Sequence, residues 1–307
     1  MLDKEVFLPD HKALYRAEYQ KRIADAPWKE WLSKPNFFMV RDEYLDKIHK
    51  WIHSTKLNKV TGLDRFKCRH MTVGSTHAFD EAYYRYSEIQ SRRLRTFRGE
   101  YAYHKRIRTD RVRLDDKEGN YLGVEENDWV ILSQPFCGNG GEQPHIKTLL
   151  DDCLAKGVPV VIDCAWYGTC RDIHIDVTHP AIKEVCFSLT KGIGLGNIRS
   201  GARYSNYEDD HLPIAQQNLY NHLPLSCAQV GIWQMDAFSP DNQWETFGHI
   251  NEKLIKENGL IQTNCIHVAL LEKGHPDYGY FEIEDSRSKV GLRFALKKEY
   301  KRLKDAK

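Results

Sequence analysis

The stretch HIKTLLDDCLAKGVPVVID, residues 145–163, contains a helix pattern followed directly by a strand pattern. Its first part repeats apolar residues on one helical stripe, at Ile146, Leu149, Leu150, Cys153 and Leu154. Gly157 then ends the helix, because glycine readily adopts the left-handed conformation that follows a helix end. The run VPVVID (158–163) is short and apolar, as expected of a buried strand that ends on an aspartate. The stretch therefore predicts a helix and a strand of an α/β protein.

Further strand patterns flank this stretch. DWVILS (128–133) and IKEVCFSL (182–189) are apolar runs bounded by turn residues, and SGARYS (200–205) is a third candidate. Strands that alternate with helices predict an α/β fold with a mainly parallel, doubly wound sheet. In such sheets ligands bind beyond the carboxyl ends of the strands, where both Asp163 and Lys191 fall.

The two ends of the chain have a different character. DEYLDKIHKWIH (42–53) has apolar residues at helical spacing, and in VGSTHAF (73–79) Ser75 or Thr76 is a natural N-cap of a helix. Residues 260–273, 278–285 and 290–303 have the pattern of strands followed by a basic helix. We therefore expect a large domain over residues 56–210, and a smaller α+β domain from residues 1–55 and 211–307.

Composition narrows the class of protein. The 307 residues are 41% hydrophobic and 29% charged, which is ordinary for a globular protein, and the net charge is only +2. Neither nucleic acid nor a membrane is therefore expected as a partner. The eight cysteines form no CxxC pair, so we expect reduced thiols and no metal site. The first residues do not resemble a secretory signal, which favours a cytoplasmic location.

The segment SLTKGIGLGNIRSG (188–201) can be interpreted in two ways. Its glycines at 192, 194 and 196 could cradle a dinucleotide, but that fingerprint requires a helix after the glycines, and the next residues have an extended pattern. Alternatively, Lys191 lies at the mouth of the crevice, where desolvation would lower the pKa of its amine and make it a nucleophile toward an aldehyde. The residues around Lys191 favour the second interpretation.

Five motifs occur in the same order as in one enzyme family. They are VGSTHAF (73–79), LSQPFCGNGGE (132–142), DCAWYG (163–168), SLTKGIGLGNIRSG with Ser188, Lys191, Arg199 and Gly201, and GLRFAL (291–296). Together they resemble the aspartate aminotransferase family, the class I/II aminotransferases, which are pyridoxal 5′-phosphate (PLP) enzymes of fold type I. The resemblance runs from about residue 70 to the end of the chain.

The resemblance implies a role for each matching residue. Lys191 would form a Schiff base with PLP and then move protons, and Asp163 would pair with the pyridine nitrogen. The phosphate would be held by Gly74, Ser75, Thr76, Ser188 and Arg199. Tyr101 would lie against the cofactor face, although Tyr103 is equally near in sequence. Arg293, on the last expected strand, would bind the carboxylate of the substrate.

Two positions depart from the family pattern. The family has a tyrosine three residues after the aspartate, whereas this chain has Trp166 there and Tyr167 next. An indole N–H donates a hydrogen bond but accepts none, so the phenolic oxygen of PLP would be tuned differently. The family's asparagine in the turn before Gly141 corresponds to Cys137 without a gap, and to Asn139 with a short insertion. Trp166 or Tyr167, and Cys137 or Asn139, could therefore contact the phenolic oxygen of PLP.

The resemblance thus implies a homodimeric aminotransferase, with its sites at the dimer interface, that exchanges an amino group between amino acids and keto acids. A lyase, decarboxylase or cyclising enzyme with the same cofactor is the first alternative, and the departures at 137 and 166 motivate it. A nucleotide-binding oxidoreductase that uses glycines 192–196 is the second. A non-catalytic protein that keeps the PLP fold as a binding module is the third.

Overall fold

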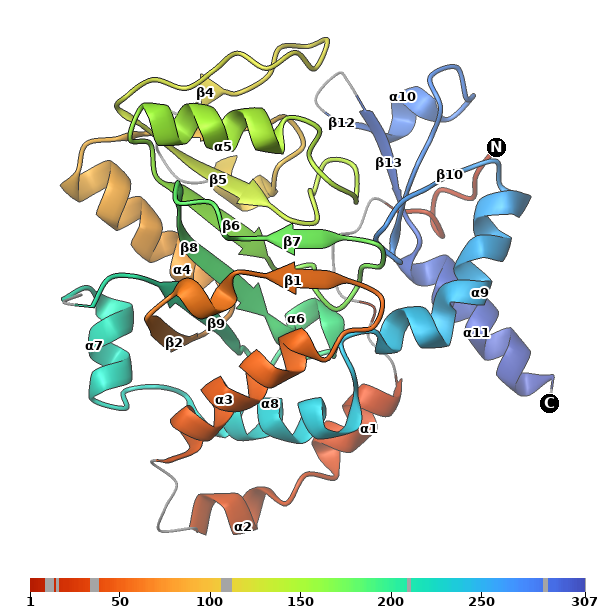
Figure 1. Cartoon of the computed structure of the whole chain (residues 1–307). Helices are drawn as coiled ribbons and strands as arrows, with labels where there is room; N and C mark the ends of the chain where they lie inside the picture. The colour runs from red at the N-terminus through yellow and green to blue at the C-terminus, as the bar shows by residue number, and fades with distance from the viewer. Residues whose placement is uncertain are drawn as a thin grey trace.

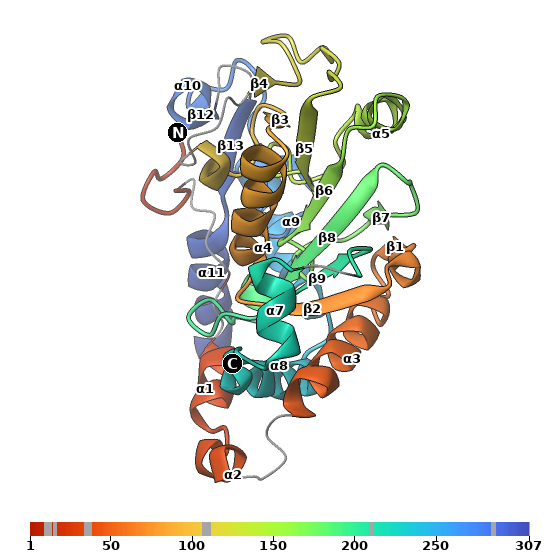
Figure 2. The same cartoon turned by 90° about the vertical axis from the view of Figure 1, so that its left-hand side faces the viewer.

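The computed structural model of the protein describes residues 1–8, 14, 17–33, 39–105, 112–208, 211–283 and 287–306 (Figure 1). A central sheet lies between helices on both of its faces, and a smaller sheet with its own helices stands beside it (Figures 1 and 2). The sequence YEDDHLP (207–213) suggests a linker between the two expected domains, and it lies partly outside the described residues.

The central sheet has seven strands in the order β2-β9-β8-β6-β5-β3-β4. Their bounds are β2 Cys68–Thr72, β3 Arg93–Thr96, β4 Val112–Arg113, β5 Asp128–Ser133, β6 Val160–Cys164, β8 Ile182–Ser188 and β9 Gly201–Ser205. Neighbouring strands are parallel except at β9, which runs antiparallel to β8 and β2. The four strands expected in the middle of the sequence are confirmed, and so is the mainly parallel sheet.

Side chains of the central strands alternate between two cores. On β5, Trp129 and Ile131 pack toward α4 (Ser75–Ala82) and η3 (Tyr83–Ile89), whereas Val130 and Leu132 face the other core. The second core includes α5 (Ile146–Ala155), the helix that the opening stretch predicts. Leu154 was expected on the buried stripe of this helix but is 49% exposed. The buried residues of α5 are Leu149, Leu150 and Cys153, a narrower stripe than the sequence pattern indicates.

Helices from both ends of the chain complete the second core. They are α1 (Ala17–Ala24), α2 (Trp28–Ser33), α3 (Val40–His53) and α8 (Leu225–Ala237). Buried residues of α3 and α8 belong to the same core as β5 and β6, and the two helices lie side by side below the sheet (Figure 1). The helix expected at 42–53 is therefore confirmed. The domain boundaries at residues 56 and 210 stay a prediction. Helices α3 and α8 lie outside these boundaries in sequence and pack on the central sheet.

The smaller sheet is antiparallel, with the order β10-β11-β13-β12. Its elements are β10 Ile261–Gln262, β11 Val268–Leu270, β12 Glu282–Ile283 and β13 Arg287–Gly291, with helices α9 Asn242–Glu257, α10 Tyr278–Phe281 and α11 Arg293–Asp305. These elements form a separate core that includes Leu2, Phe7 and Leu14. The backbone N–H of Leu2 donates to the Asp277 carboxylate at 2.7 Å, which ties the start of the chain to this part.

Two expectations for the C-terminal region are wrong. Residues 278–281 form helix α10 instead of a strand, and only Glu282–Ile283 pairs with β13. Arg293 was expected on a strand but is the first residue of α11. The reason is that β13 reaches Gly291 opposite Val268, where its partner β11 begins, so that the next residues have no strand to pair with.

The remaining elements are short. They are β1 Lys59–Thr61, which pairs with β7 His174–Asp176, and η2 Leu63–Arg65, η4 Ala102–Lys105, α6 Leu189–Gly192 and α7 Pro213–Leu219. None of the described helices is long and apolar enough to cross a membrane.

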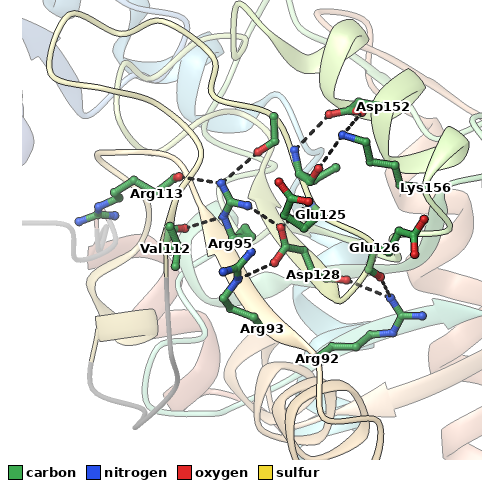
Figure 3. A network of polar contacts seen from close by, with 12 residues as sticks. Arg92, Arg93, Arg95, Val112, Arg113, Glu125, Glu126, Asp128, Asp152 and Lys156 are labelled. Carbon is green, nitrogen blue, oxygen red and sulfur yellow. Dashed lines mark hydrogen bonds and ion pairs between the residues drawn. The ribbon is translucent and has the colours of Figure 1, made fainter.

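A network of ion pairs holds the amino end of β5. The buried carboxylate of Asp128 pairs with Arg93 at 2.7 Å and also with Arg95 (Figure 3). Arg95 in turn donates to the carbonyls of Val112 and Arg113, which attaches the edge strand β4. This network lies at the opposite end of β5 from Ser133, so it supports the sheet away from the crevice where ligands are expected.

Candidate active site

The carboxyl ends of β5, β6 and β8 come together at one edge of the central sheet. Ser133 pairs with Asp163 across β5 and β6, and Asp163 pairs with Cys186 on β8. Lys191 follows β8 by three residues, in the short helix α6. The prediction that Asp163 and Lys191 share this edge is confirmed, and the two side chains influence each other's pKa.

The amine of Lys191 lies between two aromatic rings. Its Nζ atom is 5.0 Å from the centre of the Trp166 ring and 5.5 Å from that of Tyr101. The residue keeps part of its surface open to solvent, but its amino end is enclosed, and this desolvation lowers the pKa of the amine. The charge on Arg199 lowers it further, while the neighbouring Asp163 carboxyl acts in the opposite direction. The result is a lysine that loses its proton more easily than a surface lysine does.

Asp163 is 3% exposed, and its carboxylate accepts a hydrogen bond of 2.8 Å from the backbone N–H of Ala165. Burial raises the pKa of Asp163 to about 6, against the opposing effect of Lys191. A carboxylate is expensive to bury without a cation. The position of Asp163 therefore suits a site in which a cationic group of a ligand would come to it.

An arginine and several hydroxyls surround the start of α4. The Arg199 guanidinium donates to Thr76 Oγ1 at 3.1 Å and to Thr190 Oγ1 at 3.4 Å, and Ser188 Oγ donates to Thr190 Oγ1 at 2.8 Å. Gly74 has φ +81°, and a Cβ atom there would lie 2.6 Å from Arg199, so only glycine permits this approach. Gly74 is itself the residue before the helix, which corrects the expectation that Ser75 or Thr76 is the N-cap.

This arrangement has the chemistry of an anion site. The first turn of α4 presents backbone N–H groups and the positive end of the helix dipole. Arg199, Ser188 and Thr190 add charge and hydroxyl donors from β8 and the segment after it, and Thr76 adds a hydroxyl from α4 itself. The structure thus brings together the five residues expected around a phosphate, Gly74, Ser75, Thr76, Ser188 and Arg199, and adds Thr190.

At the first irregular pair of positions, Trp166 and Tyr167 point in different directions. The Trp166 ring faces the amine of Lys191 and lies 5.0 Å from the ring of His267. The Tyr167 hydroxyl donates instead to the carbonyl of Ile52 at the end of α3. Trp166 is therefore the residue that faces the lysine, and Tyr167 joins α3 to the sheet.

At the second irregular pair, Cys137 and Asn139 also separate. Cys137 is buried, and its thiol interacts electrostatically with Glu100 and Lys191. Desolvation is the main reason that the Cys137 pKa is raised to about 12, so the thiol stays protonated. The Asn139 side chain bonds within its own turn, donating to Glu142 and accepting from Gly141. Of the two, Cys137 lies beside the lysine.

The structure also separates the two candidate tyrosines. Tyr101 faces Lys191, whereas the Tyr103 hydroxyl donates to the exposed Asp80 carboxylate at 2.6 Å. Arg293 lies at the start of α11, with its guanidinium 4.5 Å from the ring of Phe294 and its charge acting on Lys297. A role for Arg293 in substrate binding stays a prediction.

Three further residues of the site belong to no motif of the sequence. Lys289, on β13, is 3% exposed, and its amine lies 5.6 Å from the centre of the Trp166 ring. Glu100 accepts hydrogen bonds of 2.8 Å from both the backbone N–H and the hydroxyl of Ser133. Gln243, on α9, donates to the carbonyls of Lys191 and Gly192 and so fixes the backbone of α6. The three residues come from distant parts of the chain and belong to no motif.

The glycines after Lys191 have a packing role. A Cβ atom at Gly192 would lie 3.1 Å from the Tyr167 carbonyl oxygen and 3.2 Å from Gly168 Cα. The loop that follows β6 and carries Trp166 therefore packs directly on α6. Extended strand β9 follows the glycines instead of the long helix that a dinucleotide fingerprint requires, which removes the support for the oxidoreductase alternative.

One other group of side chains could hold a metal ion among the described residues. Ligand atoms of His49, His53 and Asp64 lie within 4.8 Å of one another. The Arg69 guanidinium is 3.7 Å from the Asp64 carboxylate and already supplies a positive charge there. The group shares no residue with the site around Lys191.

Comparisons with known proteins identify the fold. No protein-family model matches the sequence, and no curated protein matches it. The histidinol-phosphate aminotransferase of Clostridium acetobutylicum is similar in structure, with a TM-score of 0.59 and 14% identity over 96% of both chains. The PLP-bound C-S lyase of Staphylococcus hominis has a TM-score of 0.58 and 12% identity over 85% of this chain and 80% of its own.

A third similar structure is MppP soaked with its product 2-ketoarginine, with a TM-score of 0.65 and 15% identity over 96% of this chain and 97% of that one. These likenesses confirm that the chain has the fold of PLP-dependent enzymes of fold type I, to which aminotransferases and C-S lyases belong. At such low identities the likeness establishes the fold alone, and function has to be argued from the site.

Proposed function

We propose that this protein is a PLP-dependent enzyme of fold type I that acts on amino acids, as an aminotransferase. One observation carries the proposal. A lysine with a lowered pKa lies near both a buried aspartate at the end of β6 and an anion site at the start of α4. On this fold, that set of residues matches the aldehyde, the ring nitrogen and the phosphate of one cofactor.

The residues present fit the phosphate of PLP. Arg199 reaches Thr76 and Thr190, and Gly74 leaves room for its guanidinium beside the first turn of α4. A phosphate dianion there would accept hydrogen bonds from the arginine, the hydroxyls and the backbone N–H groups around Ser75. These donors come from β8, the segment after it and α4, so the pocket depends on the folded sheet.

The residues present also fit the ring. Asp163 is a buried carboxyl that would hold the protonated ring nitrogen, and a bound cation would restore its ordinary ionised form. Trp166 and Tyr101 offer aromatic surface on either side of the lysine amine. When bound, PLP supplies an aldehyde for an amine and an electron-withdrawing ring that stabilises negative charge on the substrate's α-carbon.

The protein's own residues would then manage the proton and the substrate. Lys191 has a lowered pKa because its amine is desolvated, so it releases a proton from Nζ more readily than an exposed lysine does. The aromatic rings of Trp166 and Tyr101 limit the access of water to that amine. We propose that Arg293 binds the α-carboxylate of the substrate, as the family resemblance implies.

A lyase reaction is the second candidate, and Trp166 and Cys137 favour it. At the position of the family's tyrosine, Trp166 faces the lysine, and a protonated thiol stands where the family has an amide. Neither group reproduces the hydrogen bonds that tyrosine and asparagine make. Amino-group transfer to a keto acid distinguishes the two candidates, because a lyase forms its product without any keto acid.

We further propose a homodimer with a site at each side of the interface, and a cytoplasmic protein, as the family resemblance and the sequence imply. The oligomer is measured by light scattering with PLP and without it. A monomer that binds PLP and turns over amino acids would contradict the dimer.

Reduction with borohydride tests the cofactor assignment directly. PLP-loaded protein is reduced, digested and mapped, and we expect the label on Lys191. The matched control is Lys183→Ala on β8. The amine of Lys183 is exposed and donates to the Pro180 carbonyl, so this variant should leave the label unchanged. Lys191→Ala should lose it. A label that stays in Lys191→Ala, or that lies on another lysine of the wild type, would refute the assignment.

A further inference from the structure

A second lysine is buried in the site, and the proposed reaction does not use it. Lys289 reaches from β13 of the smaller sheet to the loop after β5, where its amine donates to the Cys137 carbonyl at 2.8 Å. Its Nζ atom and that of Lys191 lie 5.6 Å and 5.0 Å from the centre of the same Trp166 ring. Both amines therefore lie near the same aromatic ring, that of Trp166.

Within the described part of the chain, the hydrogen bonding of Lys289 is incomplete for an ammonium ion. An ammonium has three N–H donors, and the contact with the Cys137 carbonyl occupies one of them. Among the residues that the structure describes, no carboxylate lies within 4.0 Å of this amine. Desolvation and the charge on Lys191 lower its pKa, and the thiols of Cys137 and Cys265 and the Glu100 carboxyl act in the opposite direction.

The charges of the site suggest what Lys289 is for. With PLP in place, Arg199 would face the phosphate and Asp163 would face the ring nitrogen. Glu100 accepts hydrogen bonds from Ser133 and the backbone N–H of Tyr101. When protonated, Lys289 would then be a buried cation with no carboxylate of the described residues within ion-pair distance, and a partner would stabilise that charge. A carboxylate of the substrate would supply such a partner and favour the protonated amine.

We propose that Lys289 binds a second carboxylate, on the side chain of the substrate, so that the enzyme prefers amino acids with an acidic side chain. This inference rests on the proposed PLP-dependent function and on Arg293 as the partner of the α-carboxylate. Two cations at separate positions match a substrate with two anions, and a neutral side chain would leave Lys289 unpaired. Lys289 is thus a specificity-determining residue.

Binding without turnover tests the proposal. PLP-loaded protein is titrated in a calorimeter with succinate and with glutarate, which carry two carboxylates and no amine. The same titration is made with their monoamides, in which one carboxylate is replaced by an uncharged amide. We expect the better dicarboxylate to bind the wild type about 30-fold more tightly than its monoamide, in line with a desolvated charge pair. Lys289→Met should lose this preference, and Lys289→Arg should keep most of it.

Turnover provides a second readout. The ratio of kcat/KM for glutamate over glutamine, and for aspartate over asparagine, should fall in Lys289→Met while the values for the amides stay within about twofold. The control Lys273→Met removes an exposed lysine of the same domain and should change neither ratio. Thermal unfolding of each variant verifies that it is folded.

The outcomes are separable. A wild type that prefers the monoamides would overturn the inference. A Lys289→Met variant that loses affinity for acidic and neutral ligands equally would also overturn it, and would assign Lys289 to the α-carboxylate instead. A wild type that binds no PLP would instead refute the proposed function. Loss of the dicarboxylate preference in Lys289→Met, with the PLP absorbance retained, supports both.

Discussion

Replacing Asp163 by asparagine should make the empty protein more stable and the enzyme less active. Burial raises the pKa of this carboxyl from 3.8 to about 6, so the folded state holds its proton more tightly than the unfolded state does. A difference of about two units corresponds to about 3 kcal/mol at 1.36 kcal/mol per unit. This is the free energy by which ionised Asp163 destabilises the PLP-free fold.

The sign follows from linkage. Because the folded pKa lies above the unfolded one, the free energy of unfolding falls as pH rises through the window from about 4 to about 6. Asparagine keeps an oxygen that can accept from the Ala165 N–H but carries no charge to desolvate. Asp163→Asn should therefore remove this fall, and its excess stability over the wild type should be largest above pH 6, at up to about 3 kcal/mol.

Urea unfolding of PLP-free protein between pH 4 and pH 8 measures this difference. Asp25→Asn, at an exposed aspartate, is the matched control and should follow the wild type. With PLP and substrate, Asp163→Asn should lose on the order of a hundredfold in kcat, the effect of removing one preorganised electrostatic contact. A variant that is no more stable than the wild type at pH 7, or that turns over substrate equally well, would refute the reasoning.

Three further perturbations test separate parts of the structure. Gly74→Ala should weaken PLP binding about tenfold or more, because its Cβ atom would meet Arg199 at 2.6 Å. Gly119→Ala, at a glycine with a similar φ and open space around it, should not weaken binding. Fluorescence titration with PLP compares the two variants. Glu100→Gln should flatten the fall in the free energy of unfolding between about pH 4.5 and 7, since burial raises the pKa of Glu100 to about 7; the same urea series measures it, and an unchanged slope contradicts the assignment. Asp128→Ala should lower the free energy of unfolding by about 3 kcal/mol or more, because Arg95 is left buried without its partner. The affinity for PLP should stay within about twofold of the wild type. A loss of PLP affinity with unchanged stability would contradict this, because it would mean that the ion-pair network affects the site.

The sequence predicted those features that depend on neighbouring residues. The strands around Asp163 and Lys191 are short apolar runs with turn residues at both ends, so local pattern is sufficient to locate them. The rule for parallel sheets then places both residues at one edge, and the structure confirms it. The phosphate residues also follow from motifs, since Gly74 and Arg199 each lie in a recognisable stretch.

Features that depend on the packing of distant elements could not be predicted. Trp166 and Tyr167 are adjacent in sequence, and only the position of α3, whose Ile52 carbonyl accepts from Tyr167, determines which ring faces the lysine. In the sequence Lys289 has the features of an ordinary strand residue. Only the packing of β13 against the loop that contains Cys137 brings its amine to the site. Arg293 was assigned to a strand because the apolar pattern around it does not reveal where β11, the partner strand, begins.

The ionisable groups of the site share one physical feature that explains their arrangement. Burial shifts the pKa of Asp163 and Glu100 upward and that of Lys191 and Lys289 downward, so that in each case burial acts against the charged form. A site built for its own stability would pair these groups with each other, yet Asp163 and Lys191 are not within ion-pair distance of any described partner. Groups held in this state gain most when a ligand brings the opposite charge: a protonated ring nitrogen for Asp163 and a carboxylate for Lys289. Removal of the electrostatic penalty that the empty site carries should therefore strengthen the binding of PLP and substrate, and a tighter ligand stabilises the folded protein more at a given concentration.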